Sequence, residues 1–312
     1  AMKQADRKNV RFLAVIAGAI VCLGLVPVFE KLAVDSGAGL FTLVIAINVV
    51  TVICLAAPAW RQRPQGLTHG WRSLLLIGAI ASGVVVLLNL WALETTTASH
   101  RSVFQAMYPA TTAVFAFWLL GERLPLRGYL VIAVMVVGII IMSGQGLRLE
   151  FVFGDLLLML TLPMMGLCDA WARRSLTSLS AEWVAFGRFF FGTFTLLGLC
   201  LISGNPLGWP PQEAWLWILL SGISIGLGII LLYRGMALKG ASVAAALIGL
   251  SPVITLVLEW LFLAGRFTPV ELLGMLIVTV GGILLGRRYF QETDREEDAR
   301  SGVTKNSSLQ KR

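Results

Sequence analysis

The sequence predicts an all-α membrane protein with ten transmembrane helices, arranged as two inverted five-helix repeats around a central cavity. Hydrophobic residues make up 57% of the 312 residues and charged residues only 13%, with a mean hydropathy of +0.82. Soluble proteins average about 45–50% apolar and about 25% charged residues. Two further observations support the prediction: ten apolar runs of membrane-spanning length, and a second half that repeats the first.

A helix needs roughly 20 mostly apolar residues to cross a bilayer. We assign the ten spans to residues 12–34, 38–60, 73–93, 97–120, 126–144, 153–173, 181–203, 212–234, 241–264 and 268–286. Short connections that contain Gly, Pro, Asn or Ser separate them, as expected for turns. Residues 287–312 are polar and mixed in charge, which predicts a disordered cytoplasmic tail.

Basic residues predict the orientation of the chain. If the N-terminus is cytoplasmic, nearly all loop Lys and Arg residues fall on the cytoplasmic side, as the positive-inside rule requires. We therefore expect a multi-pass protein of a bacterial-type inner (plasma) membrane with both termini in the cytoplasm. The formal net charge of +8 is explained by these loops, so the sequence indicates a lipid bilayer as partner and no nucleic acid.

An internal repeat is visible at an offset of 143 residues. Tyr108-Pro-Ala-Thr-Thr-Ala-Val aligns with Ser251-Pro-Val-Ile-Thr-Leu-Val, and Gly138 aligns with Gly281. The first repeat is predicted at residues 12–144 and the second at 153–286. Because each contains five helices, an odd number, the two copies must lie upside down relative to each other. Inverted repeats are common in secondary transporters, whose substrates bind near the midplane between the repeats.

The repeated residues resemble a known family, the ten-helix EamA-domain transporters of the drug/metabolite transporter superfamily. The resemblance implies ten helices, cytoplasmic termini, a central cavity and transport of small metabolites, in many members export and in several the export of amino acids. It covers about residues 12–286. The motifs are Ala92-Leu93, Thr97-Ala98, Pro109, Gly121-Glu122-Arg123-Leu124 and Gly138, with a degenerate second copy at Ala237-Leu238, Ala241-Ser242, Pro252, Ala264-Gly265-Arg266 and Gly281.

A polar stripe in the fourth span is the first candidate substrate site. Arg101, Gln105, Tyr108 and Thr112 follow one another at steps of four, three and four, which places them on one helix face. Polar residues in a membrane span usually face the bundle interior or a water-filled cavity. We expect the stripe to line the cavity, with Arg101 holding a carboxylate or another anion. The alternative is that Arg101 reaches the outer headgroups and the others form interhelical hydrogen bonds.

The remaining candidate substrate-binding residues lie in the third, eighth and ninth spans. Ser251 and Thr255 are the repeat partners of Tyr108 and Thr112. The others are Asn89, Trp91 and Tyr233.

Acidic residues inside the spans are candidates for proton coupling. Glu30 lies within the first span and Glu259 within the ninth. Either could instead form a surface ion pair near the outer face. Arg188 in the seventh span could face the cavity, but an ion pair with Asp169 or Glu182 is favoured. Arg234 is expected to anchor a cytoplasmic helix end.

The sequence supports no cofactor, metal site or catalytic residue. Its four cysteines lie in apolar runs, its two histidines are isolated, and neither a P-loop nor a GxGxxG motif in a nucleotide-binding context occurs. A secondary transporter that moves a small polar metabolite by alternating access fits best, as an exporter of amino acids or related metabolites. An importer of a vitamin or nucleotide-like metabolite is the alternative, and a membrane scaffold or receptor, or a membrane enzyme, are the non-transport alternatives. Either a monomer or a homodimer is compatible with the sequence.

Overall fold

The computed structural model describes a helical protein. The described residues are 2–64, 70–96, 98–105, 107–121, 126–142, 153–204, 207–263, 269–270, 272–274, 276–281 and 283–284, and for residues 2–8 only the backbone is described. Helices and no strands occur within these ranges. The all-α prediction is confirmed for this part of the chain. The predicted tail, 287–312, lies outside the described residues.

The described residues of the first half form eight helical segments. Helix α1 includes Pro27, and the third apolar run is a continuous helix whose middle segment, η1, is π-helical. The segments are α1 (Met2–Asp35), α2 (Leu40–Arg61), α3 (Trp71–Ile77), η1 (Gly78–Val84), α4 (Val85–Leu93), α5 (Ala98–Gln105), α6 (Tyr108–Leu120) and α7 (Leu126–Met142).

The second half forms five labelled helices, and a further apolar helix covers Leu272–Gly281. Seven helical stretches of the described residues are long and apolar enough to cross a membrane, if Trp71–Leu93 and Ala241–Phe262 are each counted as one. Tyr108–Leu120, Leu126–Gly138 and Leu272–Gly281 are shorter. The protein is therefore a multi-pass membrane protein. The labelled helices are α8 (Phe153–Ser175), α9 (Ala181–Ser203), α10 (Ala214–Lys239), α11 (Ala241–Ile248) and α12 (Ser251–Phe262).

Two predicted continuous spans are each divided into two helices. The fourth span forms α5 and α6, and the ninth forms α11 and α12. Pro109 and Pro252 occupy the first turns of α6 and α12, where a residue without an N–H is tolerated. The 143-residue offset carries the bounds of α5 onto those of α11 and the start of α6 onto the start of α12. The internal repeat therefore extends to the positions at which these helices break.

Glycines allow matching close contacts between the two halves. A Cβ at Gly24 of α1 would lie 2.6 Å from Cβ of Ile254 in α12, and one at Gly166 of α8 would lie 2.6 Å from Oγ1 of Thr111 in α6. Ile254 and Thr111 are equivalent in the repeat alignment. The first helix of each half thus packs against the broken helix of the other half, and only glycine permits this approach.

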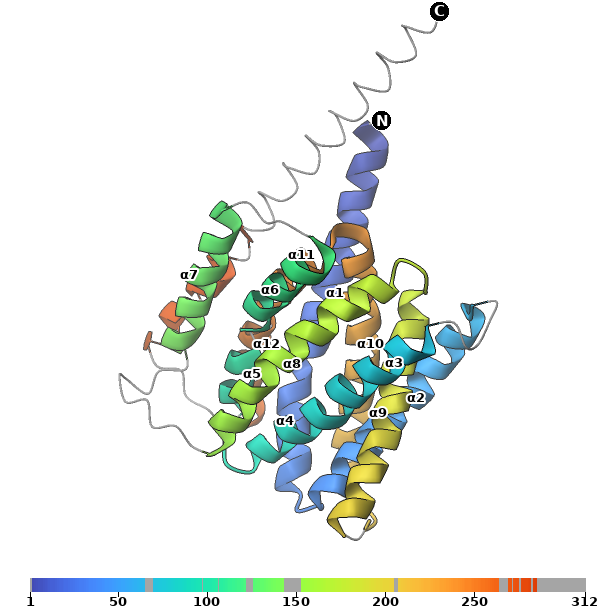
Figure 1. Cartoon of the computed structure of the whole chain (residues 1–312). Coiled ribbons are helices and arrows are strands. Elements are labelled where there is room, and N and C mark those ends of the chain that lie inside the picture. Colours follow the sequence, from blue (N-terminus) through green and yellow to red (C-terminus); the bar gives the residue numbers. More distant parts are fainter. Residues whose placement is uncertain are drawn as a thin grey trace, which may run out of the picture.

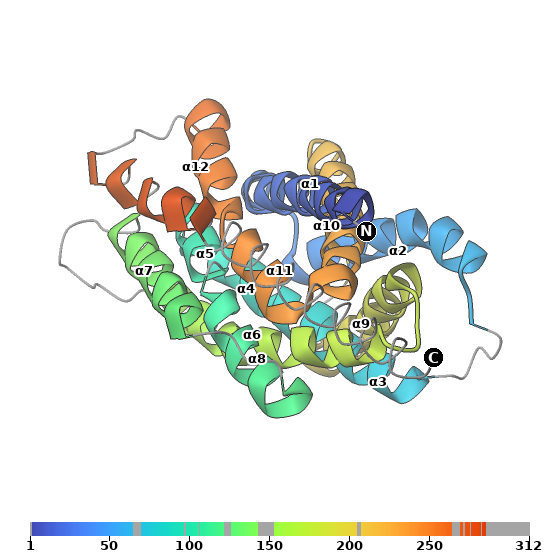
Figure 2. The same ribbon diagram turned by 90° about the horizontal axis from the view of Figure 1, so that it is seen from above.

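The helices surround an interior in which α4, α5 and α11 are central (Figures 1 and 2). Helices α1 and α8 pack against all three and α10 packs against α11, whereas α7 lies at one side of the molecule beside the C-terminal helical segments (Figure 2). The buried core extends over α1, α2, η1, α9 and α10 and includes Phe12, Ile47, Phe189 and Tyr233. This arrangement directs the polar faces of several helices toward one interior cavity.

Candidate functional site: a charged cavity between the two halves

The cavity has a volume of about 120 Å³ and is lined by helices of both halves of the chain. Apolar side chains of α1, η1, α4, α8, α10 and α11 make up much of its wall. A volume of this size holds several water molecules or the polar part of a small solute. Its polar lining residues are Glu30, Asn89, Arg101, Gln105, Tyr108, Asp169, Arg188 and Ser251.

An ion pair between α1 and α5 lies in the wall. The carboxylate of Glu30 contacts Nη1 of Arg101, and their side chains are 1% and 4% exposed. Helix α5 begins at Ala98, so Arg101 lies in its first turns, and the helix orients the guanidinium toward α1. A buried charge without a partner is costly, so each of these residues stabilises the charged form of the other. Nε of Arg101 makes no hydrogen bond within the described structure.

A second buried cation, Arg188 of α9, is held by partners from three other helical segments. Its Nε donates to Oγ of Ser82 at 3.0 Å, its Nη1 donates to the Tyr233 hydroxyl at 2.9 Å, and its Nη2 lies 3.7 Å from the sulfur of Met165. Ser82 belongs to the π-helical segment, and π-helical turns are frequent at functional sites. The guanidinium fork is thereby fixed at the cavity wall.

Asp169 of α8 lies beside this guanidinium. One of its carboxylate oxygens is 3.9 Å from Nη1 of Arg188, which is ion-pair distance but too long for a hydrogen bond. Both side chains are at least 95% buried. The cavity wall therefore carries two cations and two carboxylates, and its formal charge is balanced.

Tyr108 lies between the two charged pairs. Its hydroxyl is 3.3 Å from Oγ1 of Thr161, and Asn89 approaches it from α4. It also lies close enough to interact electrostatically with both Arg101 and Asp169. This phenol is the polar group that connects the two ends of the cavity.

The structure brings six of the predicted site residues to the cavity wall and places five elsewhere. Gln105 and Ser251 join Arg101, Tyr108, Asn89 and the proton-coupling candidate Glu30 at the wall. Thr112 is buried on α6 near Asp169, Tyr233 is buried behind Arg188, and Thr255 donates to the Gly24 carbonyl at 2.8 Å.

Two other candidates lie away from the cavity. Trp91 is 41% exposed and packs edge-on against Phe153, with ring centroids 5.6 Å apart. It lies on the face of α4 that is opposite the buried Asn89, because the two residues are only two positions apart on a helix. Glu259 is half-buried on α12 and is absent from the cavity wall.

For Arg188 the sequence favours an ion pair, with a place at the cavity as the alternative, and the structure shows both: Arg188 lies 3.9 Å from Asp169, and the two residues line the cavity. The signal that identifies them is an ionisable residue well inside an apolar span, which is a functional candidate by default. Glu182, the other expected partner of Arg188, instead accepts from Nε of Arg234 at 2.7 Å. Asp169 therefore pairs with Arg188 and Glu182 with Arg234, and of these two pairs the first lines the cavity.

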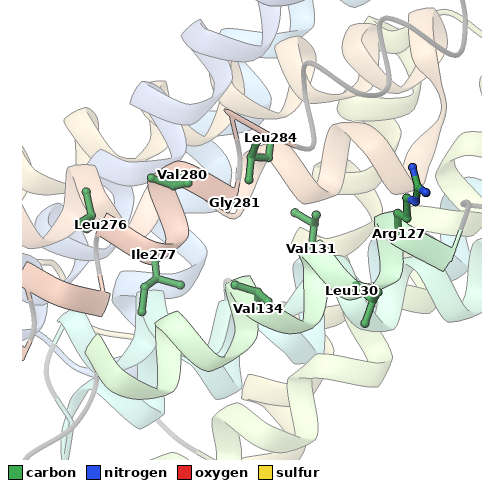
Figure 3. A pocket seen from close by; sticks show the side chains of 9 residues that line it. All are labelled: Arg127, Leu130, Val131, Val134, Leu276, Ile277, Val280, Gly281 and Leu284. Atoms are coloured by element: carbon green, nitrogen blue, oxygen red, sulfur yellow. The ribbon is translucent and has the colours of Figure 1, made fainter.

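A second hollow is a groove of about 580 Å³ between α7 and residues 276–284 (Figure 3). Its wall is apolar apart from Arg127 at one end, and it includes Leu130, Val134 and Ile277 (Figure 3). The helices touch where a Cβ at Gly138 would lie 2.7 Å from Ile277. A groove whose wall is apolar apart from one end suits lipid chains better than a polar solute.

Comparison with known families gives a match over both halves. The model of the EamA-like transporter family matches residues 11–144 and again residues 152–287. The resemblance that the repeated motifs indicate is thereby confirmed. The boundary between the two matched ranges falls between the end of α7 and the start of α8.

The individual relatives match this chain at low sequence identity or over a short segment. An uncharacterized transporter of Clostridium kluyveri is 22% identical over 239 residues, which cover 68% of this chain and 70% of that protein. An uncharacterized membrane protein of Saccharomyces cerevisiae is 36% identical over 89 residues, and the match spans only 28% of this chain and 21% of the yeast protein. A solved crystal structure superposes with a TM-score of 0.68 at 17% identity, over 89% of this chain and 98% of that one. At this identity the likeness establishes the fold.

Proposed function

Since the chain belongs to the EamA-like transporter family, whose members carry small solutes across membranes, we propose that it is a secondary transporter of a small polar metabolite. Transport proceeds by alternating access, and the cargo is an amino acid or a related metabolite that the protein exports. The substrate-binding residues are Arg101, Gln105, Tyr108, Asn89 and Ser251, together with Asp169 and Arg188.

The observation that carries this proposal is the charge pattern of the cavity. Two buried guanidinium groups and two buried carboxylates face a space enclosed by both halves of the chain. A solute that carries both an anionic and a cationic group can exchange partners with such pairs without leaving a buried charge unpaired. The cavity is smaller than the ~300–1,000 Å³ of typical ligand pockets, which favours a solute with few non-hydrogen atoms.

Alternating access is supported by the reciprocal contacts between the halves. The α1–α12 and α8–α6 contacts at Gly24 and Gly166 are what two inverted repeats would produce. We propose accordingly that ten helices cross the membrane, that residues 12–144 and 153–286 are the two repeats, and that rocking of one against the other opens the cavity alternately. The loop charges support a plasma-membrane location with both termini in the cytoplasm.

We assign proton coupling to Glu30. Its carboxylate lies in the cavity wall and is paired with Arg101, whereas Glu259 lies away from the cavity. Replacing Glu30 with Gln keeps the shape and removes the exchangeable charge. We expect Glu30→Gln to abolish the dependence of flux on a pH gradient. A variant that still follows the gradient like the wild type would exclude this role.

The experiment that tests the function is metabolite profiling in bacterial cells that overproduce the protein. Mass spectrometry compares metabolites in cells and medium for the wild type, for Gln105→Ala and for Thr193→Val. Thr193 is a matched control because, among the described residues, its hydroxyl donates within its own helix, to the Phe189 carbonyl at 2.8 Å. We expect one class of polar compound to accumulate outside with the wild type and Thr193→Val, and to fall with Gln105→Ala.

Other outcomes have defined meanings. Depletion of a compound from the medium would replace export by import and favour the vitamin or nucleotide-like cargo. Identical profiles for all variants and for cells without the protein would contradict export of any metabolite the host makes. Purified protein in liposomes then distinguishes a transporter, which moves the unchanged compound, from a scaffold, which moves nothing.

A further inference from the structure

Four buried acceptor atoms at the cavity wall have no hydrogen-bond donor among the described residues, and two of them belong to Glu30, whose carboxylate contacts the Arg101 guanidinium. Oδ1 of Asp169 and Oδ1 of Asn89 are buried, and neither accepts a hydrogen bond within the described residues. Both side chains are about 96% buried and both line the cavity. Buried acceptors are almost always satisfied in native proteins, so each exception calls for an explanation.

Arg188 does not provide the missing donor to Asp169. Its Nε, Nη1 and Nη2 are directed to Ser82, Tyr233 and Met165, and the nearest approach to the carboxylate is 3.9 Å. The guanidinium thus offsets the charge of the carboxylate while leaving its oxygen open. A planar fork held on three sides cannot turn toward a fourth partner without losing a contact.

Neighbouring hydroxyls do not satisfy these two oxygens either. Thr112 approaches the carboxylate from α6, but within the described residues its own hydroxyl makes no hydrogen bond, so this donor stands beside an oxygen that is still open. Thr161 donates to the Leu158 carbonyl at 2.6 Å and meets Tyr108 at 3.3 Å. Tyr108 neighbours both open acceptors, because Asn89 approaches its hydroxyl and Asp169 interacts with it electrostatically. The protein therefore presents a group of acceptors that a guest must satisfy.

We propose that Asp169 and Asn89 form a subsite for a primary ammonium group of the transported solute. An ammonium group offers several N–H donors and one positive charge, so it can bond both oxygens and pair with the carboxylate. This inference rests on the proposed function and makes it more specific, since it assigns the cationic end of the cargo to this side of the cavity. A quaternary ammonium, which has no N–H, does not meet the requirement.

The test is binding of propylammonium, the probe used, to the full-length protein in detergent micelles by saturation-transfer-difference NMR. Ligands of so few atoms bind in the millimolar range even at high efficiency. We expect saturable binding to the wild type, at least tenfold weaker binding to Asp169→Asn, and no saturable binding of tetramethylammonium. The matched control is Asp155→Asn, a buried carboxylate on the same helix away from the cavity, which should bind within twofold of wild type.

Size-exclusion chromatography shows whether Asp169→Asn is folded, and a second variant keeps the test decisive if it is not. Asn89→Ala removes only the neutral acceptor, and we expect at least threefold weaker propylammonium binding. Equal binding by the folded variants and the wild type, equal binding of tetramethylammonium, or no saturable binding by the wild type would overturn the subsite.

The subsite and the transport function fail in different ways. Metabolite export by a wild-type protein that binds no primary ammonium overturns the subsite and leaves transport intact. Binding of propylammonium without flux of any solute in liposomes overturns transport and leaves the subsite.

Discussion

The Glu30–Arg101 pair permits a quantitative test of what holds α1 against α5. Removing one partner of a buried pair strands the other charge and costs about 3–5 kcal/mol, whereas removing both costs much less. Glu30→Gln and Arg101→Gln should therefore each lower the free energy of unfolding by about 3–5 kcal/mol. The double variant should be more stable than either single variant.

The size of the effect follows from the burial of the pair. The side chains are 1% and 4% exposed, so solvent can neither screen nor replace the lost partner. In larger domains the unfolding midpoint shifts by roughly 2 °C for each kcal/mol of stability lost, so each single variant should unfold about 6–10 °C below the wild type. Static light scattering or intrinsic fluorescence of the protein in detergent measures these midpoints, and a double-mutant cycle gives the coupling energy.

The matched control is an ion pair within α1, between Lys31 and Asp35. Nζ of Lys31 lies 2.9 Å from Asp35 across one helical turn, with side chains 22% and 48% exposed. An exposed pair at this spacing contributes about 0.3–0.5 kcal/mol, so Asp35→Asn should move the midpoint by about 1 °C or less. Additive losses for Glu30→Gln and Arg101→Gln would refute the coupling, and so would a loss no larger than that of the control.

Three further predictions concern packing and polar contacts. Gly222→Ala should lower the free energy of unfolding by about 1–3 kcal/mol, because its Cβ would lie 2.6 Å from a side-chain carbon of α2. Gly198→Ala, whose Cβ would have nothing within 4 Å, should raise it by about 0.5–1 kcal/mol. Thermal unfolding compares the two variants, and equal shifts would contradict the contact. Thr255→Val should lower the free energy of unfolding by about 0.5–1.5 kcal/mol, because the interhelical hydrogen bond to α1 is lost. Thr193→Val should leave the unfolding midpoint unchanged. Equal midpoints for the two variants in the same assay would contradict this prediction. Arg188→Lys should cut liposome flux at least tenfold, since one ammonium cannot reproduce a fork bonded on three sides; wild-type flux would show that only the charge matters.

The sequence by itself determined that the protein is an all-α membrane protein, that its two halves repeat, and that Arg101, Gln105 and Tyr108 are polar positions of one span. Apolar runs of bilayer length force helices, because an unpaired backbone group in lipid is costly. The helical period places Arg101 and Gln105 on one face of α5, and Tyr108 at the start of α6 lines the same cavity. The 143-residue offset, read from Pro109 and Pro252, also holds for the helix boundaries on either side.

Only the tertiary structure decided which polar residues meet. Periodicity fixes the face of one helix and says nothing about which helix packs against it, so the pairing of Glu30 with Arg101 could not be read from residues 71 positions apart. For the same reason the sequence left Arg188 between Asp169 and Glu182, and it placed Trp91 in the cavity although its ring faces outward. The helix period and the bilayer act locally along the chain, whereas ion pairs and cavities arise where distant segments come together in three dimensions.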